Sequence, residues 1–268
     1  LDEIQRLTDE KVWDGEWFLR GFLDSGRKLG SKDSEGSKIF INSQTWAVLA
    51  DVAPREKLLK AMDSLHERLA TEHGIVINDP AYLSCDLEIG AVTSFPPGLK
   101  ENGGIFCHAN TWGVVAEGLL GRGQKAMDLY LSFNPAAKND TADTFTMEPY
   151  VYSQFITGKD HPLKFGRARN SWLTGTASWS FVAISQYILG VRADYDGLVV
   201  EPTIPAEWDG FKVTRVFRGA TYEIEVQNPN HVEHGVRSIL VDGKPFAGSV
   251  LPLAPSGAKV RVVVECGN

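Results

Sequence analysis

The segment from Lys100 to Trp112 concentrates more potential chemistry than any other stretch of the chain. It reads Lys-Glu-Asn-Gly-Gly-Ile-Phe-Cys-His-Ala-Asn-Thr-Trp, so an ammonium group, a carboxylate and an imidazole stand close together. The adjacent glycines let the backbone bend and approach a ligand, while Lys100, Glu101 and His108 supply charge and hydrogen-bonding groups. A lone histidine is more often structural, but a loop this rich in functional groups is typical of binding residues. The segment therefore predicts a binding site.

A second candidate is the run Ser-Trp-Leu-Thr-Gly-Thr-Ala-Ser-Trp, in which Thr174, Gly175 and Thr176 precede a predicted helix. The start of a helix offers unpaired N–H donors and the positive end of the dipole, and a glycine between two hydroxyls lets an oxyanion approach. This combination suits a phosphate. The alternative is an ordinary N-cap by a threonine, with glycine allowing close packing.

A third candidate is the run Glu-Pro-Tyr-Val-Tyr-Ser-Gln, which begins at Glu148. Glu148, Tyr152 and Gln154 could line a polar cleft, and aromatic rings with amide and carboxylate groups suit sugar rings. The alternative is the first turn of a helix, with Pro149 at its first position.

Helices must position most of these groups, because the pattern of apolar residues is mainly helical as far as residue 190. Apolar residues recur at three- and four-residue steps in several segments, and a hairpin between residues 17 and 41 interrupts them. The predicted helices cover residues 1–13, 55–73, 112–120, 126–133, 148–156 and 176–189.

After residue 196 the pattern changes, and apolar residues recur at every second position. Short alternating runs are separated by turn residues such as Asp242-Gly243 and Ser256-Gly257, which is typical of an antiparallel β-sandwich. We therefore expect a helical domain over residues 1–196 and a β-domain over residues 197–268.

Composition narrows the function classes. The chain has 268 residues and a net charge of -7, which argues against a nucleic-acid partner because such binding needs a basic surface. Three cysteines without CxxC spacing suggest neither a disulfide framework nor a zinc site, so we expect no metal and a reducing cytoplasm. No apolar run is long enough to cross a bilayer. We expect no membrane partner.

Several ordered motifs closely resemble the inverting cellobiose and chitobiose phosphorylases. The resemblance extends over nearly the whole chain, including the run from Asp14 to Arg20 and the run from Val213 to Gly219. It implies the C-terminal part of a six-hairpin (α/α) toroid followed by a β-sandwich, a mainly α protein with a β-domain. The motifs that carry it most specifically begin at Lys100, Glu148, Arg169 and Tyr187.

The resemblance also implies roles for individual residues. His108, Thr174 and Gly175 match the family's phosphate site, and Lys100, Glu101 and Gln154 match residues that contact the two sugars. The implied reaction is phosphorolysis with inversion, in which phosphate attacks the anomeric carbon and one carboxylic acid protonates the leaving oxygen. No cofactor is implied, since inorganic phosphate is a co-substrate.

One departure from the family pattern concerns the catalytic acid. In the family it is an aspartate in an Asp-Trp-Asn-Asp type of motif, upstream of the region that matches this chain, and no such motif occurs here. We therefore expect the chain to be the C-terminal portion of a longer enzyme, to need the N-terminal portion as its partner and to be inactive alone. The family also implies a homodimer.

The substrate predicted first is cellobiose, because the bulky Phe95 leaves less room for an N-acetyl group than a small residue would. The alternatives are N,N'-diacetylchitobiose and the substrates of cellodextrin, laminaribiose and cellobionate phosphorylases and of cyclic glucan synthases. A hydrolase on the same barrel and a non-catalytic carbohydrate-binding or scaffolding protein are the competing classes.

Overall fold

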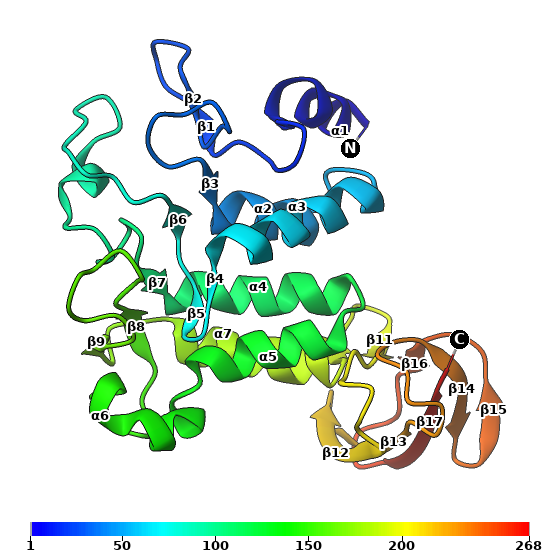
Figure 1. Cartoon of the computed structure of the whole chain (residues 1–268). Coiled ribbons are helices and arrows are strands. Elements are labelled where there is room, and N and C mark those ends of the chain that lie inside the picture. The colour runs from blue at the N-terminus through cyan, green and yellow to red at the C-terminus, as the bar shows by residue number, and fades with distance from the viewer. Residues whose placement is uncertain (1, 268) are drawn as a thin grey trace. The chain divides into compact units, whose positions relative to one another are not determined.

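A computed structural model describes residues 2–267 and separates the chain into two compact units. The first contains the residues up to Ala116 together with Asp128–Ser180, and the second contains Glu117–Met127 and the residues from Phe181 onward. Helices dominate the first unit, and strands dominate the C-terminal part of the chain (Figure 1). The chain thus combines helices and sheets, while the toroid, the sandwich and the boundary at residue 196 stay predictions. Among residues 2–267, no helix has the length and apolar character that a membrane span requires.

The helices of the first unit form where apolar residues recur with a helical period. In α3, Leu58, Met62, Leu65 and Leu69 are buried on one face, and Pro54 precedes the first turn as the sequence predicts. This helix ends at Leu69 instead of residue 73, because the next residues enter a short hairpin. The helices and helical turns that begin before Ser180 are α1 (Asp2–Leu7), the π-turn Thr8–Val12, α2 (Ile41–Leu49), α3 (Arg55–Leu69), the turn Ala91–Ser94, α4 (Cys107–Leu119), α5 (Gly123–Phe133), the turn Pro135–Thr141, α6 (Ala142–Phe145) and α7 (Thr176–Val182), which continues as the π-turn Ala183–Ile188.

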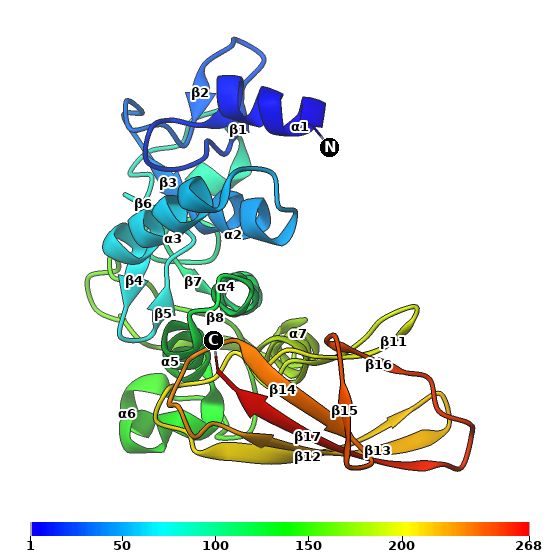
Figure 2. The ribbon, with the colours of Figure 1, turned by 90° about the vertical axis from the view of Figure 1, so that its right-hand side faces the viewer.

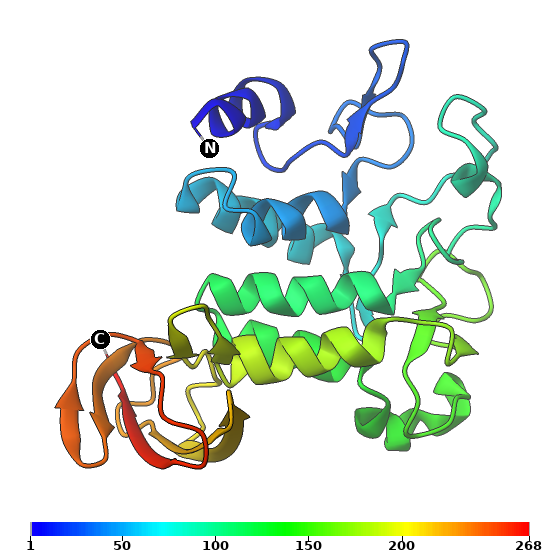
Figure 3. The same ribbon diagram turned by 180° about the vertical axis from the view of Figure 1, so that it is seen from behind.

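Short strands lead directly into two of these helices. β3 (Ile39–Phe40) runs directly into α2, and β7 (Ile105–Phe106) runs directly into α4. In Figures 1 and 3, α2, α4 and α7 lie in one stack and begin at the same end of it. The remaining strands before residue 180 are β1 (Gly21–Phe22), β2 (Lys28–Leu29), β4 (Ala70–Thr71), β5 (Gly74–Ile75), β6 (Asn78–Asp79), β8 (Ser153–Ile156) and β9 (Ala168–Ser171).

The helix predicted over residues 148–156 is wrong. Residues 153–156 form β8, the central strand of the sheet β7-β8-β9. Val151, Ser153 and Phe155 are buried whereas Tyr152 and Gln154 are half-buried, which is the period of a strand. Pro149 lies in the preceding turn and does not start a helix. The hairpin predicted between the runs at residues 17–23 and 38–41 is wrong in its second strand: Gly21 pairs with Leu29, whereas Ile39 and Phe40 pair with β6.

The second unit contains two sheets. Their orders are β10-β11-β16 and β12-β13-β17-β14-β15, and Figure 2 shows the strands of the larger sheet side by side. Pairing is antiparallel except between β13 and β17, which are parallel, so the prediction of antiparallel strands throughout is wrong for this pair. The strands are β10 (Val191–Ala193), β11 (Gly197–Val200), β12 (Gly210–Phe217), β13 (Ala220–Gln227), β14 (Val236–Val241), β15 (Lys244–Phe246), β16 (Val250–Pro252) and β17 (Lys259–Cys266).

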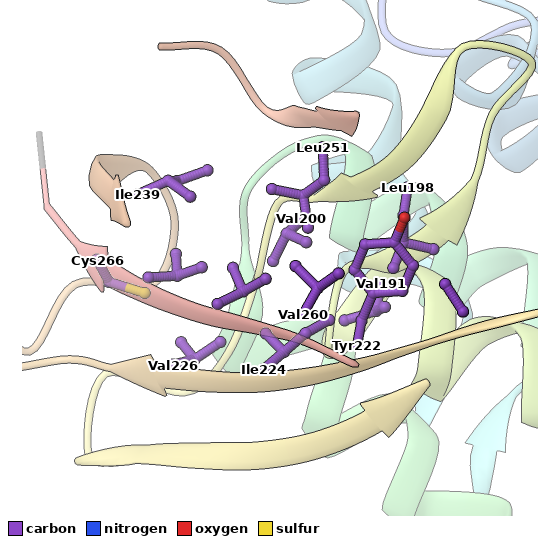
Figure 4. Packing of buried hydrophobic residues seen from close by; sticks show 13 residues of the cluster. Val191, Leu198, Val200, Tyr222, Ile224, Val226, Ile239, Leu251, Val260 and Cys266 are labelled. Atoms are coloured by element: carbon purple, nitrogen blue, oxygen red, sulfur yellow. The ribbon is translucent and has the colours of Figure 1, made fainter. Parts of the chain in front are cut away.

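The core of the second unit is built from alternate residues of these strands. Val200, Tyr222, Leu251 and Val260 lie among its buried side chains (Figure 4). The Tyr222 hydroxyl donates a hydrogen bond to the Pro252 carbonyl oxygen at 3.0 Å, so its polar end is satisfied. The period-two pattern of the sequence thus correctly predicts which residues face this core.

Candidate functional site

His108 lies in the first turn of α4, immediately after β7. Its ring centre is 4.8 Å from that of Trp112, one turn further along the same helix, and 6.3 Å from that of Trp179 on α7. Burial lowers the pKa of His108 below its usual value, which favours the neutral imidazole. Its Nε2 atom is buried and has no hydrogen-bond partner among the described residues. The structure therefore fixes the ring and leaves its Nε2 atom without a partner among the described residues.

Gly175 packs directly against the imidazole. A Cβ atom at this position would lie 3.0 Å from Cε1 and 3.2 Å from Nδ1 of His108, closer than an unstrained contact. A side chain at this position would therefore force the ring or the loop to shift by a few tenths of an ångström. The structure thus brings His108 and Gly175 together, although they are far apart in the sequence.

The two threonines around Gly175 form the start of α7. The Thr174 hydroxyl accepts a hydrogen bond from the Thr176 backbone N–H at 3.1 Å, and the two hydroxyl oxygens are 2.5 Å apart. This is the capping arrangement that the sequence allows as an alternative. The cap does not use the imidazole nitrogen of His108, so a Thr174 cap is compatible with phosphate binding at this site.

Gln154 lies on β8 and holds the loop that leads to Thr174. Its Nε2 donates to the Leu173 carbonyl oxygen at 3.2 Å, and its Oε1 accepts from the Asn170 amide at 2.9 Å. In this loop Asn170 and Trp172 both have positive φ, 55° and 68°. Gln154 therefore lies beside the Thr174 segment.

Lys100 and Glu101 lie in a tight turn before β7. Lys100 has φ of 50°, and its Nζ atom is 5.0 Å from the ring centre of Phe95. Asn102 anchors the turn, because its buried amide donates to the Tyr82 and Phe95 carbonyl oxygens at 2.9 and 2.7 Å. In residues 2–267 no hydrogen bond or ion pair joins Lys100 or Glu101 to His108. The structure fixes their backbone but does not bring their side chains into contact with the imidazole.

Three tryptophans that the sequence analysis did not select as site residues form a row, and two of them, Trp112 and Trp179, pack against His108. Trp46 on α2 packs edge-on against Trp112 on α4 at 5.3 Å, and Trp112 packs edge-on against Trp179 on α7 at 6.2 Å. Each stands about one turn inside the N-terminal end of its helix. The spacing of His108 and Trp112, four residues apart on one helix, is the sequence signal that could have found this row.

His108, Thr174, Gly175 and Thr176 form what we call the His108 cluster, and its polar groups are of types that can bind an anion. A neutral imidazole nitrogen, threonine hydroxyls and a closely approaching glycine backbone are all suited to phosphate oxygens. Within residues 2–267 there is no group of three or more His, Cys, Asp or Glu residues that could hold a metal ion.

Comparison with known proteins gives a family match. Residues 1–190 match the model of the glycosyl hydrolase 94 superfamily, catalytic domain. The chain is 43% identical over 266 residues to an N,N'-diacetylchitobiose phosphorylase of Vibrio proteolyticus and 44% identical over 266 residues to one of Vibrio furnissii, covering 98% of this chain and 33% of each relative. It is 34% identical over 262 residues to a solabiose phosphorylase of Paenibacillus borealis, covering 98% of this chain and 34% of that protein. The chain thus spans about a third of the length of these relatives.

Proposed function

Since the chain belongs to the glycosyl hydrolase 94 superfamily, we propose that it supplies the phosphate contacts and part of the sugar contacts for phosphorolysis of a β-linked disaccharide. The observation that carries the proposal is the His108 cluster, in which the buried Nε2 atom has no hydrogen-bond partner among the described residues and Gly175 packs closely against the same ring. Relatives named as disaccharide phosphorylases support the same reaction class.

In this proposal His108, Thr174 and Gly175 bind inorganic phosphate. The phosphate oxygen attacks the anomeric carbon from the face opposite the leaving sugar, and the configuration inverts. Phosphate takes the place of the base-activated water of an inverting hydrolase, so one carboxylic acid is enough to protonate the leaving oxygen. Lys100, Glu101 and Gln154 contact the sugars. No resident cofactor is needed, because phosphate is consumed.

The proposal places the acid in another part of a longer polypeptide. This fits the observation that the relatives are about three times as long as the chain. The six-hairpin toroid, the C-terminal β-sandwich, the homodimer and the cytoplasmic location belong to the same proposal and rest on the family. The 268-residue chain alone is then expected to bind ligands without turnover.

Two disaccharides fit this proposal, each favoured by a different observation. The higher identity to chitobiose phosphorylases favours N,N'-diacetylchitobiose. Phe95 favours cellobiose, because a bulky ring beside Lys100, with its centre 5.0 Å from the ammonium, leaves less room for an N-acetyl group than a small side chain would. Replacing Phe95 with valine tests this directly, and an unchanged ratio of the two activities would remove the argument for cellobiose.

The experiment that tests the proposal measures turnover of the complete polypeptide with cellobiose and with N,N'-diacetylchitobiose, with and without phosphate. We expect an α-sugar 1-phosphate, detected by phosphorus NMR. Free sugars alone in phosphate-free buffer would instead identify a hydrolase. His108→Ala should raise the phosphate KM at least about tenfold and leave the disaccharide KM within about twofold, because it removes a contact to phosphate only.

A further inference from the structure

The loop of residues 172–175, which we call the Thr174 loop, connects β9 to α7 and carries two of the proposed phosphate contacts. The side chains of Trp172 and Leu173 are 71% and 69% exposed, so packing does not hold the first half of this loop. Among residues 2–267, the backbone of these two residues makes one hydrogen bond, which the Leu173 carbonyl oxygen accepts from Gln154. This bond is therefore the tether of the first half of the loop.

The helices α2 and α4 have an anchor that α7 lacks. Both begin after an Ile-Phe pair and carry a fully buried amide four residues after the phenylalanine, Gln44 in α2 and Asn110 in α4. Each amide bonds the N–H and the carbonyl of one distant residue, Phe18 or Ile75, and also donates to the phenylalanine carbonyl. Each amide also stands two residues before a tryptophan, and the residue at that place in α7 is Ala177. The loop before α7 is thus held from outside the helix.

Asn170 orients the amide that holds the Thr174 loop. Its Nδ2 atom donates to Gln154 Oε1 at 2.9 Å, while Gln154 Nε2 donates to the Leu173 carbonyl oxygen at 3.2 Å. One end of an amide accepts and the other donates, so a donor bound to Oε1 keeps the nitrogen toward the loop. Asn170 has φ of 55°, a left-handed conformation that asparagine adopts more readily than most residues. Its side chain and its backbone therefore both serve this arrangement.

We propose that Asn170 is a positioning residue of the phosphate site. The inference rests on the proposed function. Through Gln154, Asn170 holds Leu173 and so sets where the Thr174 loop stands beside the His108 imidazole. Gln154 then has a second role besides its proposed sugar contact, because it joins the sugar-binding strand β8 to the loop that binds phosphate.

The test compares wild type and Asn170→Gly in the complete polypeptide, with phosphate varied at saturating cellobiose or N,N'-diacetylchitobiose. Glycine keeps the positive φ and removes only the amide, so the variant isolates the side chain. We expect the phosphate KM to rise about fivefold, as for the loss of one hydrogen bond, while kcat at saturating phosphate stays within about twofold. A purely structural loss of folded enzyme would lower kcat instead. Asp51→Gly, at an exposed position with φ of 49°, is the matched control.

A double-mutant cycle shows whether Asn170 acts through Gln154. It uses calorimetry of the 268-residue chain with inorganic phosphate alone, because Gln154 also contacts the sugar in the proposed function, and thermal unfolding checks that each variant is folded. Gln154→Leu should weaken phosphate binding at least about fivefold, and adding Asn170→Gly should weaken it no further.

Two results overturn the inference and leave phosphorolysis intact. They are a wild-type phosphate KM in Asn170→Gly, and a second loss of the same size when Asn170→Gly is added to Gln154→Leu. Turnover of the complete polypeptide without phosphate overturns the proposed function itself, and the inference with it.

Discussion

The substitution Gly175→Ala tests the contact on which the phosphate site depends. The added Cβ would stand 3.0 Å from Cε1 and 3.2 Å from Nδ1 of His108, whereas carbon atoms in unstrained contact are about 3.5–4.0 Å apart. The imidazole or the loop must therefore move by roughly 0.5 Å. Trp112 packs against the ring at 4.8 Å and restricts its movement.

The magnitude follows from this displacement. A misplacement of about 1 Å costs about 100-fold in rate at a positioned site. If phosphate affinity depends on position in the same way, half of that displacement predicts about a tenfold loss of affinity. That loss corresponds to about 1.4 kcal/mol. Overpacking destabilises the fold by about 1–3 kcal/mol, partly offset by the lower entropy of the unfolded chain when glycine is removed.

The assay is calorimetric titration of the chain with inorganic phosphate, together with thermal unfolding. Gly21→Ala is the matched control, because a Cβ there meets no atom within 4 Å. We expect Gly175→Ala to weaken phosphate binding about tenfold and Gly21→Ala to leave it unchanged. Wild-type phosphate affinity in a folded Gly175→Ala variant would refute the reasoning that the close approach of this loop to the imidazole forms the site.

Three further predictions concern stability and reactivity. Burial lowers the pKa of both His73 and His108 below 6.5, so the folded state binds fewer protons than the unfolded state, and the free energy of unfolding should fall as pH drops below about 6.5. Denaturant titrations at several pH values should show this fall, and His108→Gln should make it less steep. An equally steep fall in the variant would contradict the prediction for His108. Ser43→Ala removes a buried oxygen without a partner among the described residues, so it should raise the free energy of unfolding by about 1 kcal/mol in urea titrations, and a loss would count against an unpaired hydroxyl. Cys85 is exposed, whereas burial raises the pKa of Cys107 to about 12 and that of Cys266 to about 11. A thiol reagent should therefore modify Cys85 alone in the native chain and all three cysteines after unfolding. Rapid modification of Cys107 in the native chain would contradict its burial.

The helices with strong local signals were predictable, and the error over residues 148–156 shows the limit of such signals. α3 has a proline before its first turn and a single apolar stripe, so its residues alone favour a helix. Residues 153–156 pair on one side with β7 and on the other with β9. Both partners are distant in sequence, and a short apolar run flanked by Pro149 does not reveal them.

The sequence by itself determined which groups are present and where the backbone can bend. It singled out His108, Gly175 and the pair Lys100 and Glu101 as candidate binding residues, since such candidates are recognised from residue type and local conformation. Only the tertiary structure decided that Gly175 touches the His108 ring and that Trp46, Trp112 and Trp179 form one row. These facts depend on packing between helices distant in the sequence, and no local pattern encodes the distance between two side chains on different helices.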